Sequence, residues 1–301
     1  MARRDRFDIV FNNDIGPGAG TVMIGQNNIN LHAPAAQQAP QHQEPRTENG
    51  PNLSEEKKFE FNEESFHHYM KKAHVVLIHN YKYDSRDEPI REGSDKDATD
   101  LKMLFETELA FPFKEFENCS ASRIEEIVEM LSQRDFSAND GFVFIFLGHG
   151  KKEGLVGTDE KVVSISEITS SFTVDRCPSL GDKPKIFIFQ ACRGDKCDLG
   201  AFAADAEPME NTPLGRTLPV ESDFLICYAC PVGFSAFRDL EMGSWFIQSF
   251  IFMTKKYRKE EHLMDILLRV NFDVASKTCD DRFKQIPSQE CRLTKRCYFA
   301  S

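Results

Sequence analysis

A histidine and a cysteine each stand at the end of an apolar run. His149 follows GFVFIFLG (141–148), and Cys192 follows KIFIFQ (185–190) and one alanine. A thiol beside an imidazole is the basic unit of cysteine nucleophilic catalysis, in which the thiolate attacks and the imidazole protonates the leaving amine. Gly150 would let backbone N–H groups approach a developing oxyanion. A lone cysteine at a strand end is more often a small buried hydrophobe, so these residues alone leave both readings open.

The elements that must position these residues alternate between strands and helices. We expect strands at 74–80, 114–119, 141–148, 185–190 and 223–229, with two more in 285–299. We expect helices that begin near Ser94 and Ser122, at 165–172, after Gly243-Ser244 and near 261–277, with Ser94/Asp97 and Ser122/Glu125 as helix-start pairs. Unbroken apolar strands between helices predict a mostly parallel sheet covered on both faces. Ligands bind at the carboxyl ends of parallel strands, so His149 and Cys192 should share one rim.

Composition narrows the class of protein. The chain has 301 residues, 41% of them hydrophobic, and a net charge of −11, which permits a full core and argues against a nucleic acid partner. No apolar run approaches the ~20 residues of a membrane helix, and the N-terminus lacks a secretory signal. Nine cysteines without such a signal predict reduced thiols and a cytoplasmic location. Cys227 and Cys230 are interpreted as core thiols, and no metal or cofactor is expected.

Two stretches lack the periodicity of folded elements. Residues 12–58 are poor in apolar residues and rich in Asn, Gln, Gly, Ala and Pro, which predicts a disordered leader. Residues 195–219 carry Gly, Pro and acidic residues without periodicity, and such a stretch inside a compact domain needs a functional reason.

A family resemblance joins these features. Residues 190–194 read QACRG, a signature of caspases, and His149 lies 43 residues upstream of Cys192. The segments 89–101, 144–159, 175–194, 219–239 and 243–250 also resemble caspase segments, in caspase order. The chain therefore resembles short-prodomain, effector-type caspases over about residues 73–299. The resemblance implies a caspase-like three-layer α/β sandwich with a six-stranded, mostly parallel sheet and helices on both faces.

The same resemblance implies a division of the chain. Residues 1–58 would be the leader, 59–198 the large subunit, 199–219 an intersubunit linker and 220–301 the small subunit. Caspases are made as zymogens that are cut after Asp in this linker. We favour Asp205, with Asp198 second, and Asp14 for removal of the leader.

Roles at the site follow from the resemblance, position by position. Cys192 would be the nucleophile and His149 the general acid/base. The N–H groups of Gly150 and Cys192 would form the oxyanion hole. A backbone carbonyl often orients the histidine in this family, and Pro89 stands at the matching position.

Caspases cleave after Asp, and their primary pocket uses two arginines and a glutamine. Arg91, Gln190 and Arg238 stand at the matching positions. Guanidinium groups suit this task because they hold a carboxylate in a bidentate, permanently charged pair.

Several positions depart from the common caspase pattern. Gly148 stands where many members have Ser, Ser235 and Phe237 replace a common Tyr and Trp, and Asp239 replaces a frequent Asn. The Asp239 position helps to read the fourth residue upstream of the cut. Our hypothesis is that a carboxylate there disfavours an acidic side chain at that substrate position.

The resulting prediction is a cytoplasmic, Asp-specific cysteine endopeptidase zymogen. Its partners would be protein substrates, an upstream activating protease, a second copy bound through the small subunit, and regulators of the inhibitor-of-apoptosis type. Execution of cell death follows by analogy only. The alternatives are a relative that cuts after Arg, Lys or Asn, which the two pocket arginines oppose, and a catalytically silent homologue that acts as a binding or decoy partner.

Overall fold

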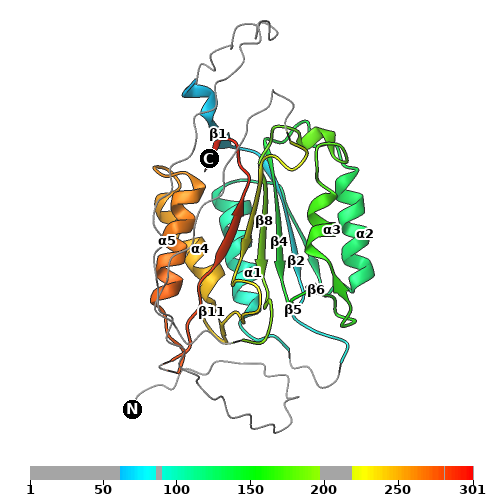
Figure 1. Ribbon diagram of the computed structural model, residues 1–301, viewed down its shortest axis with the longest axis vertical. Coiled ribbons are helices and arrows are strands. Elements are labelled where there is room, and N and C mark those ends of the chain that lie inside the picture. The colour runs from blue at the N-terminus through cyan, green and yellow to red at the C-terminus, as the bar shows by residue number, and fades with distance from the viewer. Residues whose placement is uncertain (1–61, 86–89, 197–218, 281, 301) are drawn as a thin grey trace, which may run out of the picture. The chain divides into compact units, whose positions relative to one another are not determined.

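A six-stranded sheet forms the centre of the protein. The computed structural model describes residues 62–85, 90–196, 219–280 and 282–300. The strands lie in the order β12-β9-β8-β4-β2-β3 (Figure 1). Their bounds are β2 (Ala73–His79), β3 (Phe113–Glu117), β4 (Gly141–Leu147), β8 (Lys185–Gln190), β9 (Phe224–Tyr228) and β12 (Ser288–Cys291). All neighbours are parallel except β12, which runs antiparallel to β9, so the predicted sheet is confirmed.

Helices cover both faces of this sheet. Figure 1 shows α1, α4 and α5 on one side and α2 and α3 on the other. The bounds are α1 (Ser94–Lys102), α2 (Ala121–Ser132), α3 (Ile165–Ser170), α4 (Trp245–Tyr257) and α5 (Leu263–Ser276), and a π-helical turn at Met103–Glu108 continues α1. The predicted three-layer architecture is therefore confirmed.

The apolar runs are explained by burial on two sides. Every residue of β2 is buried, and its side chains alternate between the layers. Val75 and Leu77 pack with the α1, α4 and α5 side, whereas Val76 and Ile78 pack with the α2 and α3 side. A strand covered on both faces reads as a continuous apolar run rather than as an alternation.

The two predicted helix starts are used differently from the expectation. At α2 the capping residue is Ser120, not Ser122: its hydroxyl accepts a hydrogen bond from the N–H of Arg123 at 3.3 Å. Helix α1 does begin at Ser94, but its N-cap is Gly93, which makes no side-chain capping bond. The side chains of Ser94 and Asp97 instead make long-range contacts, because burial against other elements outweighs local capping.

Several short strands lie outside the central sheet. They are β1 (His67–Met70), β5 (Gly150–Lys151), β6 (Gly154–Val156), β7 (Val162–Val163), β10 (Arg238–Asp239), β11 (Gly243–Ser244) and β13 (Arg296–Phe299), with 3-10 turns at Glu64–Phe66 and Pro178–Leu180. Of the two C-terminal strands, only β12 joins the sheet. β13 pairs in parallel with β1, a strand that the sequence did not reveal. Among the described helices, none is long and apolar enough to cross a bilayer.

Candidate active site

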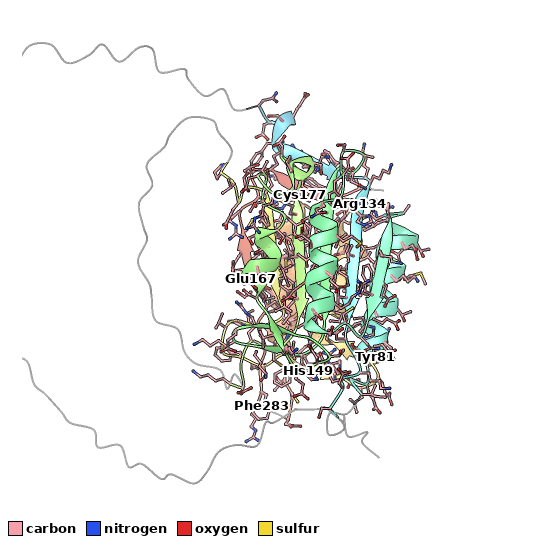
Figure 2. All side chains as sticks on the ribbon, turned by 90° about the vertical axis from the view of Figure 1, so that its right-hand side faces the viewer. Tyr81, Arg134, His149, Glu167, Cys177 and Phe283 are labelled. Atoms are coloured by element: carbon pink, nitrogen blue, oxygen red, sulfur yellow. The ribbon has the colours of Figure 1, made fainter. Side chains whose placement is uncertain are left out.

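The structure brings His149 and Cys192 to the same edge of the sheet. β4 and β8 are parallel neighbours, with Leu147 opposite Gln190. The pairing continues past the strand ends, because the N–H of Gly148 donates to the carbonyl of Gln190 at 3.2 Å. His149 lies at this end of the sheet in Figure 2. Two residues distant in sequence therefore emerge where ligands bind in parallel sheets.

The backbone after His149 passes directly against the backbone of the cysteine. A Cβ atom added to Gly150 would collide with the carbonyl oxygen of Cys192 and with Cβ of Ala191. Only glycine permits this close approach. The backbone of Gly150 therefore packs directly against the backbone of Cys192.

The Cys192 thiol is partly exposed and lies against the loop that follows β9. The N–H of Ala236 donates to Sγ at 3.4 Å. The two loops are bound together, because the N–H of Arg193 donates to the carbonyl of Phe234 at 2.9 Å and the N–H of Gly233 donates to the carbonyl of Arg193 at 2.7 Å. This loop pairing sets the position of the thiol.

Tyr83 holds the histidine segment. Its hydroxyl accepts a hydrogen bond from the N–H of His149 at 2.7 Å, and the two ring centroids lie 4.6 Å apart. Burial, and then the positive charges of Arg91 and Arg238, lower the pKa of His149 from 6.5 to about 3. The imidazole is therefore neutral at pH 7 and is able to accept a proton.

A narrow pocket contains both chemical groups. Its lining consists of Arg91, Gly148, His149, Gln190, Ala191, Cys192, Ser235, Ala236, Phe237 and Arg238. A water molecule needs roughly 10–15 Å³ of such space. A cavity of about 50 Å³ therefore takes a group of a few heavy atoms, such as a carboxylate.

The polar end of this pocket is built from three side chains. Arg91 is only 5% exposed, and its Nη1 donates to the carbonyl of Asn80 at 3.3 Å. Arg238 donates from Nε to the carbonyl of Glu92 at 2.8 Å. Oε1 of Gln190 is buried without a hydrogen-bond partner among the described residues. The two guanidinium groups favour an anionic ligand, and the unpaired oxygen of Gln190 favours a ligand that also offers a hydrogen-bond donor.

The remaining predicted binding residues lie around this pocket. The Ser235 hydroxyl donates to the carbonyl of Gly194 at 3.2 Å. Phe237 is buried, with its ring centroid 5.1 Å from that of Trp245. Asp239 lies one residue beyond the lining, and its Oδ1 accepts bonds from the N–H groups of Glu241 and Met242 at 2.8 and 2.7 Å.

Four predicted positions lie outside the described residues: Pro89, Asp14, Asp198 and Asp205. A larger groove of about 480 Å³ is described elsewhere, between α2 and α3. None of the residues that line it is a cysteine or a histidine, so the smaller pocket is the stronger candidate for catalysis.

Two further polar residues of the site escaped the sequence analysis. Tyr83 follows β2 in a stretch without periodicity, where nothing local marks a tyrosine as a hydrogen-bond acceptor for a residue 66 positions away. Oε1 of Gln285 accepts a hydrogen bond from the N–H of Phe237 at 2.6 Å, and its amide donates to the carbonyl of Ala229 at 2.9 Å, which ties the pocket loop to the residue that follows β9. Only long-range packing reveals either role.

The chain is similar to known proteins over most of its length. The sequence model of the caspase domain matches residues 71–298. Caspase-3 of Felis catus is 35% identical over 232 residues, which cover 74% of this chain and 82% of that protein. Caspase-7 of Gallus gallus is 34% identical over 245 residues, which cover 77% of this chain and 78% of that protein. The chain belongs to the caspase family and is, by this homology, a caspase-like cysteine protease.

Proposed function

We propose that this chain hydrolyses peptide bonds after Asp, with Cys192 as the nucleophile and His149 as the general acid/base. The single observation that carries the proposal is the shared pocket. Two arginines and a buried glutamine line the same narrow cavity as the thiol and the imidazole. Such a cavity holds a side-chain carboxylate while the adjacent peptide bond reaches the thiol.

The chemistry begins with the neutral imidazole of His149, which accepts the proton of the Cys192 thiol. The thiolate then attacks the carbonyl carbon of the substrate, and the N–H groups of Gly150 and Cys192 stabilise the oxyanion. The imidazolium returns its proton to the leaving amine as the C–N bond breaks. A water molecule, deprotonated by the same imidazole, hydrolyses the acyl-enzyme and regenerates the thiol.

Substrate binding would also tune the general base. Two positive charges contribute to the low pKa of His149 in the empty pocket. A substrate carboxylate between Arg91 and Arg238 would neutralise part of this charge and so raise the pKa of the imidazole, while burial, the largest cause of the low pKa, remains. An Asp side chain in the pocket would therefore increase the proton affinity of His149.

The division of the chain is part of the proposal. Residues 59–198 would form the large subunit and 220–301 the small subunit, with activation by cleavage at Asp205 or Asp198 in the linker. The active form would be a dimer joined through the small subunits, and the physiological role would be execution of apoptosis. Membership of the family supports this division. The proposed boundary also falls in the stretch of chain after β8, which ends at Gln190, and before β9, which begins at Phe224.

The test uses the full chain and its Cys192→Ala variant. We expect the wild type, alone or after an engineered cut of the linker, to hydrolyse fluorogenic tetrapeptides that end in Asp. Peptides that end in Glu, Asn or Arg should react far more slowly. Intact mass would locate self-cleavage, which must be absent from the variant. A cut, folded wild type without activity would instead support a catalytically silent homologue that acts by binding.

A further inference from the structure

A line of buried polar groups runs from the specificity pocket into the core. Nη1 of Arg91 donates to the hydroxyl oxygen of Ser94 at 3.1 Å. The same hydroxyl lies 2.8 Å from Nε2 of His79. Nδ1 of His79 lies 3.8 Å from Oε1 of Glu115. These groups come from the loop after β2, the first turn of α1, the end of β2, and β3.

The proton positions along this line follow from the chemistry of the groups. A guanidinium has only donors, so the Ser94 oxygen accepts from Arg91. When Nε2 of His79 is unprotonated, it accepts the single hydroxyl proton of Ser94. In that tautomer the imidazole proton resides on Nδ1, facing the carboxylate of Glu115. In this arrangement Arg91 donates to Ser94, Ser94 donates to His79, and Nδ1–H of His79 faces Glu115. The imidazole is then uncharged, because its Nε2 carries no proton.

The surroundings of His79 favour that uncharged form. The side chain is buried, and burial followed by the charges of Arg91 and Arg238 lowers its pKa to about 4. Asp95, with an oxygen 3.9 Å from Nε2, and Glu115 would favour the charged form. Burial outweighs them here because Asp95 is 78% exposed and is screened by water. These contacts are thus not ion pairs at pH 7.

We propose that His79 is a positioning residue of the specificity pocket, which orients the Ser94 hydroxyl so that its oxygen holds the guanidinium of Arg91. The inference rests on the proposed role of Arg91 in binding the substrate carboxylate. A second anchor, the carbonyl of Asn80, contacts the same nitrogen at 3.3 Å. With both acceptors in place, the guanidinium is held ready before the substrate arrives, which reduces the ordering cost of binding.

The position of His79 distinguishes this role from ordinary core packing. His74 lies on the same strand and is also buried, and its pKa is also lowered to about 4. Its ring packs 5.9 Å from that of Phe136 and lines no part of the pocket. The two histidines therefore share burial and strand but not a link to Arg91, which makes His74 a matched control.

The test measures steady-state kinetics of the linker-cleaved full chain with Asp-ending and Glu-ending tetrapeptides. We expect Ser94→Ala and His79→Phe each to raise KM for the Asp peptide about tenfold, the value of one hydrogen bond to a charged group. The kcat should change little, because the lost contact holds the substrate equally well in the ground state and in the transition state. The preference for Asp over Glu should fall in both variants.

A double-mutant cycle decides whether the two residues act as one unit. The double variant should be about as impaired as either single variant, since both remove the same link. In His79→Gln, the side-chain amide reaches the position of Nε2, so the KM should be close to that of the wild type and well below that of His79→Phe. His74→Phe and Ser249→Ala, which replace buried groups away from the pocket, should leave KM and the Asp preference unchanged.

The outcomes separate the two proposals. A cut wild type that hydrolyses no Asp peptide overturns the proposed function and the inference with it. An active wild type whose Ser94→Ala variant keeps its KM and Asp preference overturns the inference alone. Additive effects in the double variant, or an equal loss in His74→Phe, would also overturn it. Should His79→Phe fail to fold, Ser94→Ala and His79→Gln still decide the matter.

Discussion

Asp97 should make the stability of this protein depend on pH in a way that one substitution removes. Its carboxylate is 1% exposed, and both of its oxygens lie 3.0 Å from the N–H of Ser244. The amide of Gln248 donates to Oδ1 at 2.9 Å. Burial raises the pKa of Asp97 from 3.8 to about 6, because these donors only partly replace the lost hydration.

The sign follows from the direction of this change. The folded state binds the proton more tightly than the unfolded chain, so this contribution to stability is fully present below about pH 4. The contribution is lost as the pH rises through about 6. At higher pH the free energy of unfolding no longer changes with the titration of Asp97. Each pH unit between the two pKa values is worth about 1.36 kcal/mol, so the total is on the order of 3 kcal/mol. In Asp97→Asn, a neutral amide removes this titration.

The assay is denaturant unfolding at a series of pH values between 4 and 7, in a Cys192→Ala background that prevents self-cleavage. The free energy of unfolding of Asp97→Asn, relative to its parent, should rise by ~2.5 kcal/mol from pH 4 to pH 7. Asp95→Asn is the matched control, since that side chain is 78% exposed on the same helix. A difference that stays constant with pH, or that falls, would refute the reasoning.

Two further predictions concern the pocket. A Cβ on Gly148 would lie 2.5 Å from the ring of Phe146, so Gly148→Ser should displace the His149 segment and lower kcat/KM for an Asp peptide by ~10-fold or more. Undiminished activity would contradict this. Arg91→Gln removes a positive charge near His149 and should raise the pKa of that imidazole. NMR titration of the ring would measure the pKa, and a lower value would show that the charge is not a cause.

The strands that carry the site were predictable because their patterns are local. β4 and residues 186–189 of β8 are apolar, since both faces of these strands are covered, and the residues singled out for chemistry follow within two positions of each strand end. Parallel strands present their carboxyl ends at one edge. The common edge of His149 and Cys192 was therefore predictable on the condition that the two strands are near each other, and the structure supplies that condition by pairing β4 with β8.

The helix starts and the C-terminal strands were less predictable. Ser120 rather than Ser122 caps α2, a choice between two serines that depends on where the chain turns into the helix. β13 pairs with β1 rather than with the central sheet. Pairing partners are set by competition among all exposed strand edges, and a single strand's sequence carries little of that information.

By itself, the sequence determined the fold class, the family resemblance and the residue types able to perform the chemistry, because periodicity and motif spacing are properties of neighbouring residues. Only the tertiary structure decided how these residues are held. Tyr83 on the His149 backbone, Gly150 against Cys192, and the line from Arg91 through Ser94 to His79 join segments that share no local pattern. Such contacts arise when packing forces buried polar groups to find partners, and that requirement is met only in the complete fold.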